Sequence, residues 1–211
     1  MAPQPGPRED RDRARISLWL KIPYTLFVAV LVPVYTAEYG AQNFLWYSDV
    51  ALLVMTAALW LESRLLASMM SVGFLLPELV WVADFLATIA LRRPVLSVAG
   101  YMVDPSIPLH LRGLSLFHLM LPPVMLWCLY RLGYDRRALC FQIPVTWGLL
   151  LATFLFTDPE ANINWAFGLG AEPQHRIPPP LYLALMMIAA PLLLHLPTHV
   201  ALSRLFAPKT R

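Results

Sequence analysis

The chain has 211 residues, of which 58% are hydrophobic and 14% charged, and its formal net charge is +3. Soluble domains carry about 45–50% apolar and about 25% charged residues, so these values exclude an ordinary water-soluble protein. The aromatic content of 12% and the mean hydropathy of +0.59 exclude an intrinsically disordered chain and leave an integral membrane protein.

Six apolar runs follow a polar N-terminal segment. Residues 1–15 contain three prolines and seven charges, which predicts a disordered cytoplasmic tail. Each later run is close to the length of about 20 residues that a membrane-spanning helix needs. The predicted spans are Ser17–Tyr35, Phe44–Leu61, Leu65–Leu91, Leu114–Leu132, Ala138–Thr157 and Leu181–Phe206. The sequence therefore predicts an all-α transmembrane bundle over residues 16–206, with a short cytoplasmic tail at residues 207–211.

Prolines interrupt several of these runs, including Pro77, Pro122 and Pro191. An interior proline costs about 3 kcal/mol in a soluble helix because it removes a hydrogen bond. Membrane helices tolerate proline where neighbouring groups bond the freed carbonyl. We therefore expect kinks in the third, fourth and sixth spans.

Lysine and arginine are divided unevenly between alternate connections. The N-terminal tail, the second-to-third turn, the fourth-to-fifth turn and the C-terminus hold twelve when Lys21, Arg131 and Arg204 at the adjoining span ends are included, whereas the other three connections hold four. Cytoplasmic loops are enriched in these residues, so both termini are predicted to lie in the cytoplasm, as in a multi-pass protein of the bacterial inner membrane. A nucleic-acid-binding protein would gather its basic residues on one soluble face. We therefore expect membrane lipids, and no nucleic acid, as partners.

Three ionisable side chains lie at similar depth near the outer ends of the predicted spans: Asp49, Asp84 and His118. Charged groups inside a membrane are costly, so they mark a functional site or a buried pair. If Asp49 or Asp84 holds His118 in one tautomer, the imidazole can act as a general base toward a hydroxyl or a water molecule. In the competing interpretation, these groups bond one another and fix the packing of the helices.

The two long outer connections, residues 92–113 and 158–180, are rich in proline, glycine and aromatic residues. Long ordered loops frequently carry function. The candidate substrate-binding residues there and at the start of the second span are Asn43, Asn162, Asn164 and Trp165. Amides and an aromatic ring can hold a lipid headgroup or a polar substrate. The same residues are equally typical of a turn anchored at the membrane interface.

Three further residues have two interpretations each. Glu78 follows Pro77 among apolar neighbours; it is a candidate proton relay, or it bonds a carbonyl that the proline leaves free. His195 and His199 have the i, i+4 spacing of zinc-binding helices and are candidate metal ligands, with interhelical hydrogen bonding as the alternative. The sequence indicates no cofactor.

Five segments carry a resemblance to a known family. They are NFLWYSD (Asn43–Asp49), LLPELVWVADF (Leu75–Phe85), SLFHLMLPP (Ser115–Pro123), RLGYDRRAL (Arg131–Leu139) and NINWAFG (Asn162–Gly168). In them the chain resembles a family of small bacterial multi-pass membrane proteins of unassigned activity, which implies a fold but no catalytic residue. A six-helix body with an intramembrane histidine is also similar to the androgen-induced-type membrane hydrolases of eukaryotes. These use a threonine and a histidine on lipid esters, and Thr56, Thr88 and Thr157 compete for the threonine.

Three functional hypotheses follow. In the first, the outer polar cluster acts on a lipid or lipophilic substrate, as in a hydrolase or transferase. In the second, the protein is a small transporter or proton-coupled carrier, which requires a continuous water path from His118 to His199. In the third, it is a non-catalytic scaffold or assembly protein whose polar groups pair with one another and leave no cavity.

Overall fold

Regular structure in the protein is helical throughout. The computed structural model describes residues 16–93, 95–96, 98–170 and 172–206, and no strand occurs among them. The predicted all-α class is thereby confirmed. Both predicted tails, residues 1–15 and 207–211, lie outside the described residues.

Six main helical segments follow one another along the described chain. They are α2 (Leu18–Tyr39), α3 (Tyr47–Leu61), α4 (Arg64–Leu91), α5 (Leu109–Leu114) with α6 (Phe117–Leu132), α7 (Ala138–Phe156), and α8 (Pro179–Ala189) with the π-helix η5 (Ala190–His195) and α9 (Leu196–Leu205). Short 3-10 helices lie between them: η1 (Ala41–Leu45), η2 (Gly100–Val103), η3 (Pro159–Ala161) and η4 (Ile163–Trp165).

Five of these segments are long and apolar enough to cross a membrane: α2, α4, α5 with α6, α7, and α8 through α9. The exception is α3, whose 15 residues are fewer than the predicted second span. Phe44 and Leu45 belong to η1 instead, because Trp46 has an extended backbone conformation (φ −57°, ψ 137°) that interrupts the helix.

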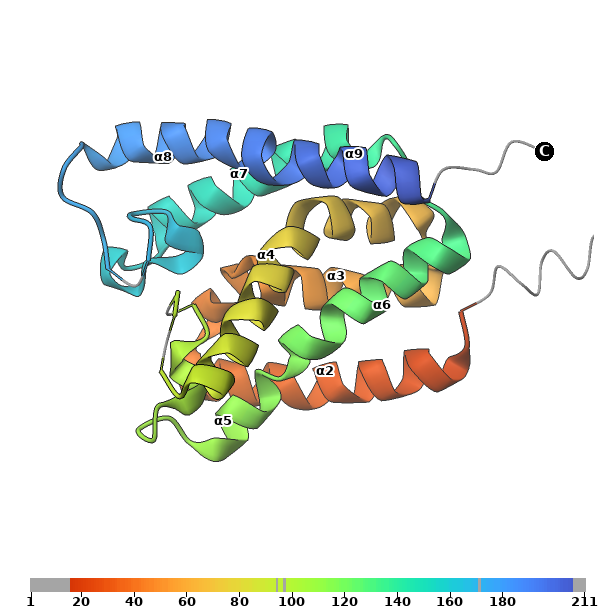
Figure 1. Ribbon diagram of the computed structural model, residues 1–211, viewed down its shortest axis with the longest axis horizontal. Helices are drawn as coiled ribbons and strands as arrows, with labels where there is room; N and C mark the ends of the chain where they lie inside the picture. Colours follow the sequence, from red (N-terminus) through yellow and green to blue (C-terminus); the bar gives the residue numbers. More distant parts are fainter. Residues whose placement is uncertain (1–15, 94, 97, 171, 207–211) are drawn as a thin grey trace, which may run out of the picture.

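Helix α4 occupies the centre of the bundle and packs against α3, α6, α7, α9 and η5. In Figure 1, α7 and α8–α9 lie on one side of α4, while α2 and α6 lie on the other. The connections after α4 and α7 lie at one end of the molecule, here called the loop end. The start of α2, the end of α9 and the turns at residues 62–63 and 133–137 lie at the opposite end, the terminal end (Figure 1).

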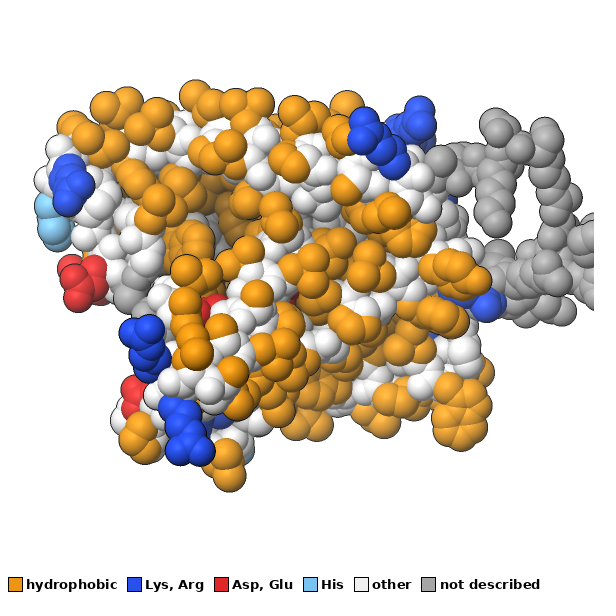
Figure 2. Space-filling view, viewed as in Figure 1, with side chains coloured by type: hydrophobic (Ala, Val, Ile, Leu, Met, Phe, Trp, Pro, Cys, Tyr) orange, Lys and Arg blue, Asp and Glu red, His pale blue; other side chains and the backbone are white. Residues whose placement is uncertain are grey.

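Apolar side chains fill the interior and also cover the outside. Tyr24, Phe74 and Met125 are almost fully buried between the helices, whereas Trp19 is 91% exposed and Leu193 is 68% exposed. Hydrophobic side chains spread over the surface between the two ends, and most of the visible Lys and Arg side chains lie toward those ends (Figure 2). A surface of this kind is suited to contact with lipid.

The last segment accommodates Pro191 by changing helix type. Proline has no N–H, so the carbonyl of Met187 loses its usual donor one turn later. Trp147 of α7 donates to this carbonyl from its indole nitrogen at 2.6 Å. The chain then follows the π-helix η5 before it continues as α9. A partner from another helix thus compensates for the proline, as membrane helices require.

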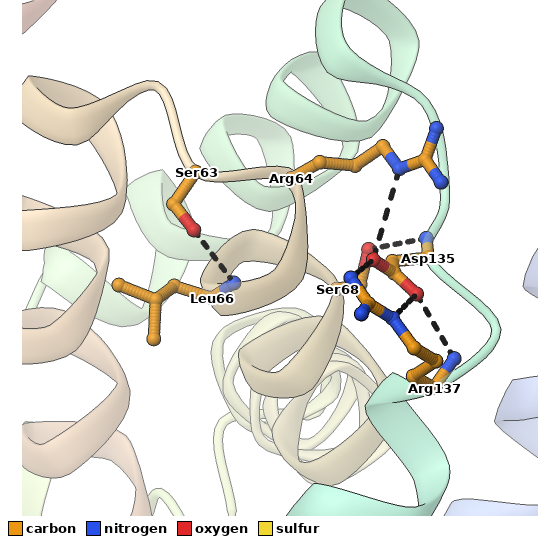
Figure 3. Close-up of polar contacts among 6 residues, drawn as sticks. All are labelled: Ser63, Arg64, Leu66, Ser68, Asp135 and Arg137. Atoms are coloured by element: carbon orange, nitrogen blue, oxygen red, sulfur yellow. Dashed lines mark hydrogen bonds and ion pairs between the residues drawn. The ribbon is translucent and has the colours of Figure 1, made fainter.

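At the terminal end, Asp135 joins the α6–α7 link to the start of α4 (Figure 3). Its carboxylate accepts hydrogen bonds from Arg137 Nε at 3.1 Å and Nη2 at 2.9 Å, and Arg64 Nε lies 4.0 Å away. The backbone N–H of Asp135 donates to Ser68 Oγ at 2.9 Å. The bonds from Arg137 hold the pKa of Asp135 below its usual value of 3.8.

The Asp135→Asn variant is therefore expected to be less stable than the wild type at neutral pH. Because the folded pKa of Asp135 is lowered, its stabilisation is present above the unfolded value of 3.8 and is lost as the pH falls through the folded value. Thermal unfolding in detergent from about pH 7 to about pH 3 should show the two proteins converging at the lowest pH. A difference that stays constant over this range would contradict the assignment.

The predicted orientation is open to a labelling test, because the described chain ends share one end of the molecule. In a background without Cys128 and Cys140, one cysteine is introduced at exposed His175 or at exposed Leu61. With cytoplasmic termini, a membrane-impermeant maleimide is expected to label His175→Cys in intact cells and Leu61→Cys only after permeabilisation. The reverse pattern would invert the orientation.

Candidate functional site

Glu78 and His118 form a buried carboxylate–imidazole pair between α4 and α6. Glu78 Oε2 lies 2.7 Å from His118 Nδ1, and both residues are buried. The two helices pack along each other extensively, which brings residues 40 positions apart in the sequence into contact. Glu78, expected to be an isolated relay residue or to bond a carbonyl, is therefore the carboxylate that holds His118.

Aromatic rings fix the plane of this imidazole. Trp81, one helical turn beyond Glu78 on α4, stacks on His118 with ring centroids 4.2 Å apart and planes 19° apart. Phe117 also stacks on it at 4.2 Å and 23°. Trp81 in turn stacks on Phe85 at 5.2 Å. The imidazole thus has a fixed orientation, which acid–base chemistry requires of a general base.

Asp49 lies near this pair and is not bonded to His118. Its carboxylate is buried in the first turn of α3 and close enough to Glu78 for the two charges to interact. Oδ2 accepts a long hydrogen bond of 3.4 Å from Asn43, while Oδ1 has no hydrogen-bond partner among the described residues. Two of the predicted site residues, Asn43 and Asp49, are thus brought together beside the Glu78–His118 pair.

Asp84 was expected to hold His118, but its carboxylate bonds the backbone of the following loop instead. Its two carboxylate oxygens accept hydrogen bonds from the backbone N–H groups of Leu96 at 2.7 Å and Ala99 at 2.9 Å. These bonds fold the connection after α4 back onto the helix, where Ala99 packs against Trp81 and Phe85. Asp84 therefore anchors a loop, and the carboxylate that meets His118 comes from the preceding part of α4.

Asn164 joins the second long connection to the start of α3. Its amide nitrogen donates to the carbonyl of Leu45 at 2.7 Å and to Thr153 Oγ1 at 3.3 Å, and its amide oxygen accepts from the N–H of Tyr47 at 2.8 Å. The residue is buried, and its left-handed backbone (φ 55°) continues into Trp165 (φ 56°), which is half-buried. The predicted substrate-binding amide thus serves as a clamp between segments.

Asn162 organises the same connection from within. Its amide nitrogen donates to the carbonyls of Gly168 and Gly170 at 2.9 and 3.0 Å, and its oxygen accepts from the N–H of Phe167 at 3.0 Å. Gly168 has no room for a side chain, since a Cβ would lie 2.5 Å from the backbone nitrogen of Gln174. The Asn162 side chain therefore makes its hydrogen bonds within the loop, which favours the interpretation of this segment as a turn.

The two candidate metal ligands of the last span have separate partners. His195 Nε2 lies 3.3 Å from Thr146 Oγ1, and His199 Nδ1 lies 2.7 Å from the Tyr134 hydroxyl. No cluster of three or more His, Cys, Asp or Glu residues able to hold a metal ion occurs in the described part of the chain. His195 and His199 therefore make the interhelical hydrogen bonds that were the alternative prediction.

Sequence reasoning missed a second polar group, which surrounds His195. Gln142 Nε2 donates to Thr146 Oγ1 at 3.2 Å, and Gln142 and Thr146 are fully buried. Gly73 of α4 leaves room for the Gln142 side chain, because a Cβ there would lie 2.4 Å from its amide nitrogen. Gln142 is the only amide side chain within the six predicted spans, and this was the signal available in the sequence.

Replacing Asn164 with alanine is expected to destabilise the folded protein by about 2 kcal/mol or more, because the carbonyl of Leu45 and the N–H of Tyr47 both lose a partner. Urea or thermal unfolding in detergent measures the change. The matched control, Gln42→Ala, removes an exposed amide next to the same segment and should leave stability within about 0.5 kcal/mol of the wild type. Equal losses in both variants would contradict the clamp.

Comparison with known proteins adds no family to this description. The sequence matches no protein-family model, no curated protein and no solved structure. The resemblance inferred from the five segments therefore stays a prediction. What the structure shows is a helical protein whose described residues include five helices long and apolar enough to cross a membrane.

Proposed function

We propose that the protein is a membrane-embedded enzyme that carries out hydrolysis or group transfer on a lipid or lipophilic substrate, with His118 as the general base. The observation that carries this proposal is the buried hydrogen bond of 2.7 Å between Glu78 and His118. Glu78 is a positioning residue, because it acts through the imidazole.

The hydrogen bond between Glu78 and His118 determines which nitrogen of the imidazole can act as the base. An ionised Glu78 accepts a hydrogen bond from Nδ1–H and so keeps the proton on that nitrogen, which leaves the lone pair of Nε2 to take up a proton. The hydrogen bond to Glu78 uses Nδ1, and 11% of the His118 side-chain surface is exposed. The bond to Glu78 therefore leaves Nε2 available for base catalysis.

Nearby charge favours the protonated intermediate state of the imidazole. Glu78 Oε2 is in direct contact with the ring, 2.7 Å from Nδ1. A carboxylate beside a histidine stabilises the imidazolium that forms when the ring removes a proton from water or a hydroxyl group. The Glu78 carboxylate thus supports proton uptake at Nε2.

The surroundings indicate the class of substrate. Trp81, Phe117 and the apolar faces of α4 and α6 enclose the pair, and the outside of the bundle is apolar as well. The apolar outer faces of these helices suit a substrate that arrives from the bilayer. A lipid with an ester or similar bond near the loop end is therefore the substrate that the arrangement suits.

The experiment uses the purified protein in nanodiscs of phosphatidylethanolamine and phosphatidylglycerol with a fluorescent acyl-labelled phosphatidylethanolamine. Mass spectrometry follows hydrolysis and acyl-transfer products. His118→Gln is expected to lower product formation by about 10²- to 10⁴-fold, the usual contribution of a general base. His110→Gln, which changes an exposed histidine on α5, and Glu160→Gln, which changes an exposed carboxylate, should retain wild-type rates.

Glu78 tests the positioning role separately. Glu78→Gln should lower the rate and change the shape of its pH profile, while Glu78→Asp should recover part of the rate because it keeps the carboxylate. Unchanged product formation in folded His118→Gln and Glu78→Gln would refute His118 as the general base and Glu78 as its positioning residue. Absence of any product, together with a proton flux in liposomes that Glu78→Gln abolishes, would favour the carrier hypothesis instead.

A further inference from the structure

A shallow apolar groove runs along the outside of the bundle toward the terminal end. Its volume is about 440 Å³, and its walls come from Pro123, Leu126, Trp127 and Tyr130 of α6 together with Phe206, directly after α9. Every wall residue is aliphatic or aromatic, so the groove suits a hydrocarbon chain.

The terminal end also carries an excess of positive charge. The basic residues described there are Lys21, Arg64, Arg131, Arg136, Arg137 and Arg204. Among the described residues at this end the acidic side chains are Glu62 and Asp135, and each already pairs with a cation, Lys21 and Arg137 respectively. Lys and Arg side chains gather at the upper right of Figure 2, where α9 ends. The excess charge favours an anion.

One of these cations lies beside the groove, and two others lie on segments that adjoin its walls in the chain. The Arg131 guanidinium lies 5.8 Å from the centre of the Trp127 ring, which forms one wall. The Tyr134 hydroxyl meets His199 at 2.7 Å and so holds the α6–α7 link against α9. In that link, Arg136 lies within electrostatic range of His199. Arg204 is exposed and precedes the wall residue Phe206 by two positions.

We propose that the groove and these arginines form a binding site for an anionic phospholipid. One acyl chain lies in the groove, and the phosphate group meets Arg136 and Arg204. The Trp127 and Tyr130 rings lie next to each other, tilted by 33° with centroids 5.7 Å apart, and amphipathic rings of this kind favour the headgroup region. Basic residues at this level attract anionic lipids, and the site is independent of the chemistry assigned to His118.

The first test compares lipid classes by native mass spectrometry of the delipidated full-length protein. The wild type should bind dioleoyl phosphatidylglycerol more tightly than dioleoyl phosphatidylcholine, by about fivefold for each contributing arginine. The double variant Arg136→Gln/Arg204→Gln should lose this preference. The matched control, Arg92→Gln/Arg93→Gln, removes two exposed arginines at the loop end and should keep it.

The second test asks whether an acyl chain of the bound lipid lies in the groove, next to Trp127. Phosphatidylglycerol with brominated chains should quench the tryptophan fluorescence of the wild type more strongly than brominated phosphatidylcholine at the same low mole fraction. This excess should disappear in Trp127→Phe and persist in Trp19→Phe, which changes an exposed tryptophan of α2 at the same end.

Three outcomes would overturn the proposal. Equal binding of both lipids would contradict the preference for an anionic headgroup. Excess quenching that persists in Trp127→Phe would contradict the position of the acyl chain in the groove. Displacement of phosphatidylglycerol by an equal concentration of inorganic phosphate would indicate a site for free phosphate. Both measurements read lipid binding alone, so a failure here is distinct from a failure of the proposed enzyme.

Discussion

Polar groups among apolar helices need hydrogen-bond partners within the protein, because a hydrocarbon environment offers none. The tertiary arrangement of this chain depends on that requirement. The carbonyl that Pro191 leaves free accepts from Trp147 on a different helix, Asp84 takes two N–H groups of the following loop, and Asn164 joins the loop after α7 to the start of α3. Each bond removes a desolvation cost and at the same time determines which segments lie together.

The Glu78–His118 bond belongs to this set but differs in chemistry. Most of the other buried contacts use at least one neutral group, whereas here two ionisable side chains meet inside the bundle at 2.7 Å. Burying such a pair is expensive, and well-packed apolar residues often give equal or greater stability. The aromatic rings stacked on His118 add a fixed orientation that simple helix packing does not need. These features together make the pair the chemical centre of the molecule, while the basic terminal end faces a different part of the surroundings.

The sequence identified Asp49, Glu78, Asp84 and His118 as polar residues among apolar helices, but not all of their partners. Glu78 and Asp84 lie on one helix, six residues apart, which separates them by about 9 Å along the axis and turns them toward different faces. Depth in the membrane can be predicted from the ends of an apolar run, but the rotation of each helix about its axis cannot. His118 was therefore expected to meet Asp49 or Asp84 and bonds Glu78 instead, while Gln142 became part of a network only because Gly73 lies opposite it.

Composition and the spacing of apolar runs determined the helical class, the succession of helices and their approximate ends, because burial of backbone polar groups in lipid leaves few alternatives to long helices. They also determined that Asp49, Glu78 and His118 lie among apolar groups. Only the tertiary structure decided that α4 lies at the centre, that its Glu78 faces His118 on α6, and that Asn162 and Asn164 serve the loops. The physical reason is that Glu78 and His118 are 40 positions apart and Leu45 and Asn164 are 119 positions apart. Such contacts are selected by the packing of segments against one another, which local sequence does not encode.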